Sequence, residues 1–127
     1  EKRRTGNTAN NAEALTLIGE VQDRDVIIVD DEVDTGGSIA QAVNVVRNNG
    51  ARNMYLAFIH PIFSRNAAQR LAELPIKHII TTDTVPIPPE KMEPLAGRVT
   101  ILSVAPMLGE VIRRAHEGRS VGEMFNE

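Results

Sequence analysis

Acidic, hydroxyl and glycine residues follow one another in one short segment of the chain, residues 29–39, which reads VDDEVDTGGSI. Gly36 and Gly37 allow the backbone to bend tightly and to approach a ligand closely. A helix that begins directly after them directs free N–H groups and the positive end of its dipole toward that ligand. Because Thr35 and Ser38 add hydroxyl donors, this loop has the composition of a site for one phosphate group.

Two carboxylates precede this loop and cannot serve the same phosphate. Asp30 and Asp31 are hydrogen-bond acceptors, so a phosphate would repel them if they pointed at it. Their natural partners are hydroxyl groups or a cation. A ligand with a phosphate at one end and vicinal hydroxyls at the other suits both halves of the segment, and ribose 5-phosphate is the simplest such molecule.

A simpler interpretation of DTGGS is an Asp-capped turn that starts a helix, because Asp, Thr, Ser and Gly all favour turns and helix N-caps. The carboxylates before it favour the functional interpretation. Asp30, Asp31 and Asp34 crowd one strand end, and their mutual repulsion is a cost that a purely structural turn would avoid.

The elements that position this segment follow from the pattern of apolar residues. Residues 25–29 (DVIIV) form a short apolar run rich in β-branched residues, which is typical of a strand covered on both faces. The spacing of Ile39, Val43 and Val46 predicts a helix, and Gly50 marks its end. The acidic and glycine-rich segment therefore connects the carboxyl end of a strand to a helix, where open parallel sheets bind ligands.

Strands and helices alternate through the rest of the chain. The predicted strands cover residues 54–59, 78–80 and 99–102, and the predicted helices cover residues 66–74 and 106–116. This alternation predicts an α/β fold with a mostly parallel sheet and flanking helices. Residues 14–21 fit a strand or one helical turn, and the proline-rich residues 85–94 are predicted to be a loop. The apolar side chains of the last helix are predicted to form a buried stripe: Met107, Leu108, Val111, Ile112 and Ala115.

Composition limits the classes of partner. The 127 residues suit one domain, and 14 basic against 17 acidic residues give a net charge of −3, without a broad cationic surface for nucleic acid or anionic lipid. No apolar stretch approaches the roughly 20 residues of a membrane helix. The chain has no cysteine and so no disulfide or thiolate metal site. We therefore expect a cytoplasmic protein without nucleic-acid or membrane partners.

The segment IVDDEVDTGGS, residues 28–38, resembles the phosphoribosyl pyrophosphate signature of the type I phosphoribosyltransferases. Further segments resemble the ribose-phosphate pyrophosphokinases in order and spacing: KRR at 2–4, LIGEV at 17–21, HP at 60–61, TDT at 82–84 and LGEVIRRAHEGRSVGEMF at 108–125. The resemblance covers essentially the whole chain. It implies a type I phosphoribosyltransferase-like fold, with residues 1–127 forming the carboxyl-terminal domain and the upstream part absent.

The resemblance also implies roles for individual residues. Asp30 and Asp31 would bind the ribose hydroxyls, and Lys2 and Arg4 would be catalytic cations of a mobile loop that closes over the ATP phosphates. The 5-phosphate loop would consist of Asp34, Thr35, Gly36, Gly37 and Ser38. Ser38 stands where threonine is commoner in the family, and it keeps the hydroxyl.

The family reaction is attack by the 1-hydroxyl of ribose 5-phosphate on the β-phosphorus of ATP, which gives phosphoribosyl pyrophosphate and AMP. Mg²⁺ is the expected cofactor because it bridges and neutralises phosphate oxygens. The resemblance further implies a homo-oligomer, a hexamer built from dimers. Because two sheet strands of the family domain belong upstream, this chain by itself should expose an unpaired sheet edge and be a poor catalyst. A type I phosphoribosyltransferase and a non-catalytic, synthetase-associated regulatory subunit are the alternatives.

Four other residues have side chains that could do chemistry. His60, His78 and His116 lie far apart without metal-ligand spacing, which favours ordinary structural roles. Asp83 follows a predicted strand, so it fits equally a ligand contact and a turn-forming aspartate.

Overall fold

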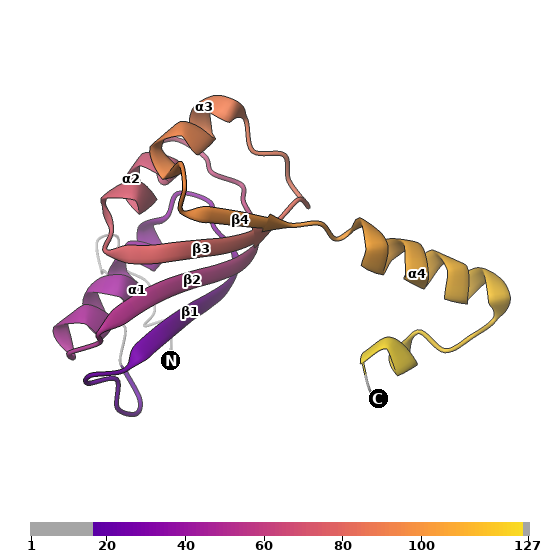
Figure 1. The fold of residues 1–127 in the computed structure, drawn as a ribbon, viewed down its shortest axis with the longest axis horizontal. Helices are drawn as coiled ribbons and strands as arrows, with labels where there is room; N and C mark the ends of the chain where they lie inside the picture. Colours follow the sequence, from indigo (N-terminus) through magenta and orange to yellow (C-terminus); the bar gives the residue numbers. More distant parts are fainter. Residues whose placement is uncertain (1–16, 126–127) are drawn as a thin grey trace, which may run out of the picture.

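The computed structural model describes residues 17–125, in which strands and helices alternate along most of the chain (Figure 1). The strands are β1 (Asp25–Glu32), β2 (Asn53–His60), β3 (Ile76–Thr82) and β4 (Val99–Leu102). The helices are α1 (Gly37–Asn48), α2 (Ala67–Glu73), α3 (Pro89–Met92) and α4 (Ala105–Glu117), and the 3₁₀ helices are η1 (Glu93–Leu95) and η2 (Gly122–Phe125). The predicted α/β architecture is confirmed. Of the ambiguous residues 14–21, residues 17–21 form neither a strand nor a helix, and the others lie outside the described part.

The four strands form one parallel sheet in the order β1-β2-β3-β4. The register pairs Ile28 with Leu56 and Leu56 with Ile79, so the carboxyl ends of all strands reach the same edge of the sheet. Within the described residues β1 pairs on one side only. The strand ends that can carry a site are therefore brought together.

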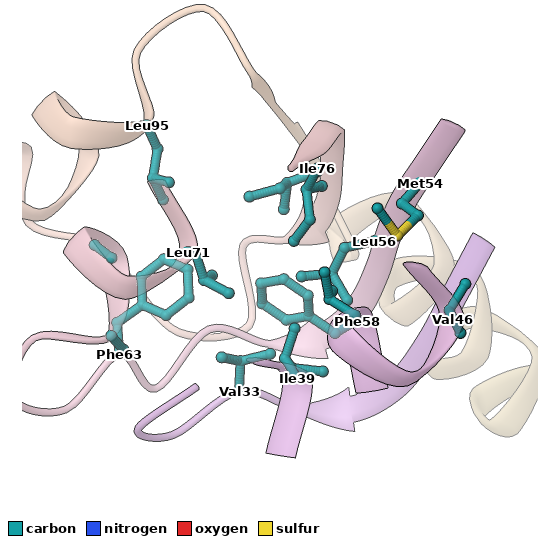
Figure 2. Close-up of a cluster of buried hydrophobic side chains, with 14 residues drawn as sticks. Val33, Ile39, Val46, Met54, Leu56, Phe58, Phe63, Leu71, Ile76 and Leu95 are labelled. Carbon is teal, nitrogen blue, oxygen red and sulfur yellow. The ribbon is translucent and has the colours of Figure 1, made fainter. Parts of the chain in front are cut away.

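One face of the sheet is covered by α1, α2 and the segment of α3 and η1, and the core lies between them. Figure 2 shows side chains from all of these layers converging, with the Phe58 and Phe63 ring centroids 5.8 Å apart. Leu56 and Leu71 are fully buried. Burying a side chain of this size contributes about 1.5–3 kcal/mol, so this layer holds the sheet and its helices together. The buried apolar residues are Val33, Ile39, Val43, Val46, Met54, Leu56, Phe58, Phe63, Ala67, Ala68, Leu71, Ile76, Ile79 and Leu95.

The opposite face of the sheet is apolar and exposed. Ile27 is 62% exposed and Val29 is 76% exposed, although the apolar run 25–29 predicted a strand covered on both faces. Ile59, Ile80 and Leu102 continue this surface across the other strands. No element within residues 17–125 packs on it, so the prediction for β1 holds on one face only. We call this surface the open face.

Helix α4 extends away from the sheet, and η2 lies beside it after a turn (Figure 1). The prediction of a buried stripe here is wrong for the described chain: Met107 is 44%, Leu108 50% and Ile112 70% exposed, and the helix has no buried residue. The apolar spacing correctly indicates a helix with one apolar side, but spacing cannot show whether another element covers that side. Hydrogen bonds stabilise the polar side of the helix. Arg114 donates to the carboxylates of Glu110 and Glu123 and to the Ser120 carbonyl.

The proline-rich residues 85–94 are not a plain loop, which corrects the prediction from the sequence. Pro89 occupies the first turn of α3, where a fixed φ suits the helix and no N–H is needed. Lys91 Nζ donates a hydrogen bond of 2.6 Å to the Phe63 carbonyl, and Leu95 is fully buried. This short helical segment therefore closes the core above α2. No helix in residues 17–125 is long and apolar enough to span a membrane.

We predict that Leu71→Ala lowers the free energy of unfolding by about 2–5 kcal/mol, because it leaves a cavity in a fully buried site. Leu108→Ala makes the same chemical change on a half-exposed helix face and should cost less than about 1 kcal/mol. Urea unfolding of both variants measures the difference. Equal losses would show that α4 is packed against another surface in solution.

Candidate functional site

The glycine-rich segment connects the carboxyl end of β1 to the start of α1. Gly36 lies in the left-handed region, with φ 74° and ψ 7°, which favours glycine over other residues. Gly37 begins the helix, and no side chain of residues 17–125 caps the helix N-terminus. The first N–H groups of α1 are thus left for a ligand or water, as the sequence predicted for an anion site.

Backbone hydrogen bonds fasten this loop to the segment that follows β2. The Val33 N–H donates to the His60 carbonyl, and the Phe63 N–H donates to the Val33 carbonyl, both at 3.0 Å. The Ser64 N–H donates to the Asp34 carbonyl, also at 3.0 Å. The Val33 side chain is 2% exposed and anchors the loop in the core. The loop is therefore a fixed part of the fold.

A cavity of about 260 Å³ lies at the turn, and residues 30–39 line it without interruption. The predicted ribose-binding and phosphate-binding residues all stand along this one cavity: Asp30, Asp31, Asp34, Thr35, Gly36, Gly37 and Ser38. The structure thus brings together the carboxylates, the hydroxyls and the glycine bend that the sequence grouped. Lys2 and Arg4, the predicted catalytic cations, lie outside the described residues.

The two aspartates before the loop are linked to each other through the backbone. The Asp31 N–H donates to Asp30 Oδ1 at 3.0 Å, and the Glu32 N–H donates to Asp31 Oδ1 at 2.9 Å. Hydrogen bonding with the Asp30 side chain, followed by that from the Glu32 N–H, lowers the pKa of the Asp31 carboxyl. Asp31 is therefore ionised at neutral pH, and it keeps acceptor lone pairs for a ligand hydroxyl.

Mg²⁺ is the cofactor expected from the sequence, and it would have to bind in the same region. Within residues 17–125 no group of three His, Asp or Glu side chains could hold a metal ion. The carboxylates of Asp30 and Asp31 are oxygen donors of the kind that Mg²⁺ accepts, but a full Mg²⁺ shell needs water or phosphate oxygens in addition. The described residues alone do not form a metal site.

Asp83, His60 and His78 have hydrogen-bond partners within the described chain. The Val104 N–H donates to Asp83 Oδ1 at 2.8 Å, next to the start of α4. The Ser103 side chain, followed by the Val104 N–H, lowers the pKa of Asp83. Asp83 thus serves the chain at the β4–α4 junction and does not line the cavity of the loop. His60 pairs with Thr84 at 2.9 Å and His78 with Thr100 at 2.8 Å.

One residue at the loop was not predicted from the sequence. Arg70 of α2 donates from Nη1 to the Thr35 carbonyl at 2.7 Å. The sequence does show two positively charged residues after β2, Arg65 and Arg70, that could reach the loop. The spacing alone could not tell which of them reaches the loop.

A parallel sheet with two aspartates and a glycine bend at the carboxyl end of a strand defines an α/β protein of the phosphoribosyltransferase-like class. Residues 5–126 match the model of the phosphoribosyl synthetase-associated domain family, and the chain belongs to that family. The match includes the loop and every described element.

Curated relatives and a solved structure agree with this family. The chain is 41% identical to a ribose-phosphate pyrophosphokinase of Caldanaerobacter subterraneus subsp. tengcongensis, over 98% of this chain and 38% of that protein. It is 40% identical to a ribose-phosphate pyrophosphokinase of Shewanella oneidensis, over 99% of this chain and 39% of that protein. The crystal structure of phosphoribosylpyrophosphate synthetase from Mycobacterium smegmatis is similar with a TM-score of 0.74 and 40% identity, over 80% of this chain and 33% of that chain. The chain thus spans less than two fifths of the length of these relatives.

The two glycines of the bend should respond differently to alanine. Gly36→Ala forces a side chain into the left-handed region and should destabilise the fold by about 1–2 kcal/mol. Gly37→Ala lies in a helix, where alanine is favoured over glycine by roughly 0.5–1 kcal/mol, so the fold should be unharmed. Thermal unfolding compares the two variants. A loss for Gly37→Ala as large as that for Gly36→Ala would contradict this account of the bend.

Proposed function

We propose that this chain supplies the ribose 5-phosphate site of a ribose-phosphate pyrophosphokinase. That enzyme transfers the β,γ-diphosphoryl group of ATP to the 1-hydroxyl of ribose 5-phosphate, and its products are phosphoribosyl pyrophosphate and AMP. The observation that carries the proposal is the single cavity lined by residues 30–39, in which the aspartates and the glycine bend adjoin. The identity of about 40% with enzymes of that name supports it over nearly the whole chain.

Each end of the sugar phosphate has a chemically matched group in the cavity. The uncapped N–H groups at the start of α1 and the hydroxyls of Thr35 and Ser38 donate to the 5-phosphate oxygens. The ionised carboxylate of Asp31, with Asp30 beside it, accepts from the ribose hydroxyls. This arrangement keeps the negative charges of protein and ligand apart.

The reacting end of the sugar requires groups that stabilise developing negative charge. In the transfer the 1-hydroxyl oxygen forms a bond to the β-phosphorus, the bond from that phosphorus to the oxygen of AMP breaks, and the hydroxyl proton is lost. Lys2 and Arg4 are the cations that we assign to the transferred phosphates, and a bound Mg²⁺ would add positive charge that neutralises the phosphate oxygens. A homo-oligomer in the cytoplasm is part of the same proposal.

A second candidate function is a non-catalytic, synthetase-associated subunit that binds the sugar phosphate without turnover. One observation favours it: the matching family is described as a synthetase-associated domain. A type I phosphoribosyltransferase shares the loop signature, but it would transfer the sugar to a base and release no AMP. AMP release therefore separates the pyrophosphokinase from the other two functions.

Asp31→Ala should weaken the binding of ribose 5-phosphate by roughly tenfold to a hundredfold, the range for losing a hydrogen bond to a charged group. Isothermal calorimetry on the 127-residue chain measures the affinity. Asp25→Ala is the matched control, because Asp25 lies at the other end of β1 and its ion pair with Arg52 is exposed and weak. Saturable binding that is equally strong in both variants would remove Asp31 from the site.

A chimaera tests the reaction. When this chain replaces the matching region of the Caldanaerobacter relative, we expect AMP release from ATP and ribose 5-phosphate in the presence of Mg²⁺. Lys2→Ala and Arg4→Ala in the chimaera should each lower kcat by about a hundredfold and change the affinity for ribose 5-phosphate little, because the cations act mainly in the transition state. A folded chimaera that binds ribose 5-phosphate but releases no AMP would favour the non-catalytic subunit.

A further inference from the structure

The side chain of Arg70 lies against the loop that connects β1 to α1. Its Nη1 donates to the Thr35 carbonyl at 2.7 Å, although Arg70 belongs to α2, in the next βα unit of the chain. A Cβ added to Gly36 would lie 3.7 Å from the Arg70 Cδ, and one added to Gly37 would lie 3.7 Å from its Nη1. Arg70 is not among the residues that line the cavity.

This contact fixes the orientation of one peptide group. The peptide between Thr35 and Gly36 is planar and trans, so its carbonyl and its N–H point in opposite directions. Holding the Thr35 carbonyl toward α2 therefore holds the Gly36 N–H on the side away from Arg70. Without such a bond the peptide could turn over more easily, because Gly36 can adopt φ values of either sign.

The charge of Arg70 strengthens the same effect. The guanidinium is a charged donor, and a hydrogen bond from a charged donor is roughly twice as strong as a neutral one. In the described chain Arg70 directs this charge at the Thr35 carbonyl. A carbonyl oxygen that faced the ligand would repel a phosphate, and Arg70 keeps this oxygen turned away.

We propose that Arg70 is a positioning residue for the phosphate loop: it orients the Thr35–Gly36 peptide so that the Gly36 N–H is available to the 5-phosphate. This inference rests on the proposed function for the identity of the ligand. The orientation of the peptide, however, is a property of the free protein. It can therefore be tested with and without ribose 5-phosphate.

The experiment compares Arg70→Met and Arg70→Lys with the parent chain, and Arg47→Met serves as the control. Arg47 is an exposed arginine of α1, so the control makes the same change in charge away from the loop. The Gly36 amide resonance in ¹H–¹⁵N spectra of the free protein reports the orientation of the Thr35–Gly36 peptide. Calorimetry measures the affinity for ribose 5-phosphate. Urea unfolding reports the stability of the fold.

In Arg70→Met we expect the Gly36 amide resonance to shift or broaden and the affinity for ribose 5-phosphate to fall roughly tenfold or more. The urea midpoint should stay near that of the parent, because Arg70 is exposed. Arg70→Lys keeps a charged donor and should recover part of both changes. Arg47→Met should change neither.

Two results would overturn the proposal. The first is a Gly36 amide resonance that is the same in Arg70→Met as in the parent, whatever the binding data show. The second is an unchanged affinity in Arg70→Met when the parent chain binds ribose 5-phosphate. A parent chain that does not bind ribose 5-phosphate would instead contradict the proposed function, and the amide resonance would still decide whether Arg70 orients the peptide.

Discussion

Hydrogen bonds between the loop after β1 and the segment after β2 fix the position of the candidate site, because they tie Val33 and Asp34 to the chain beyond the sheet edge. Phe63 supplies one of these bonds from a left-handed backbone conformation, with φ 47°. That conformation costs about 1–2 kcal/mol, whereas burying the Phe63 side chain contributes about 1.5–3 kcal/mol. The core thus offsets the local strain that holds the loop in place.

Negative and positive groups occupy different parts of the candidate site, although they lie only a few residues apart in the sequence. Carboxylates occupy the end of β1, and a few residues later the backbone offers uncapped N–H groups at the start of α1. The left-handed conformation of Gly36 turns the chain between these two regions, and Arg70 adds a positive charge behind the turn. One connection between a strand and a helix can therefore meet a ligand that carries a phosphate and hydroxyls.

The sequence predicted the features that depend on local periodicity and missed those that depend on distant contacts. The apolar, β-branched run at residues 25–29 and the spacing of Ile39, Val43 and Val46 were sufficient for β1 and α1. The helical turn at Pro89 was missed because proline was treated as a breaker, although it suits the first turn of a helix. Arg70 was missed because its contact with Thr35 joins residues 35 positions apart, and no spacing rule describes it.

The open face and the unpaired edge of β1 together favour aggregation of the described chain. An edge strand with apolar side chains beside it is a template on which another copy can add a strand. The run Asp30, Asp31 and Glu32 places charge at the end of that edge, where stacked copies would bring like charges together. Asp30 and Asp31, which we assign to the ribose hydroxyls, would thus also act as gatekeepers against aggregation, and a neutral replacement there would remove both properties at once.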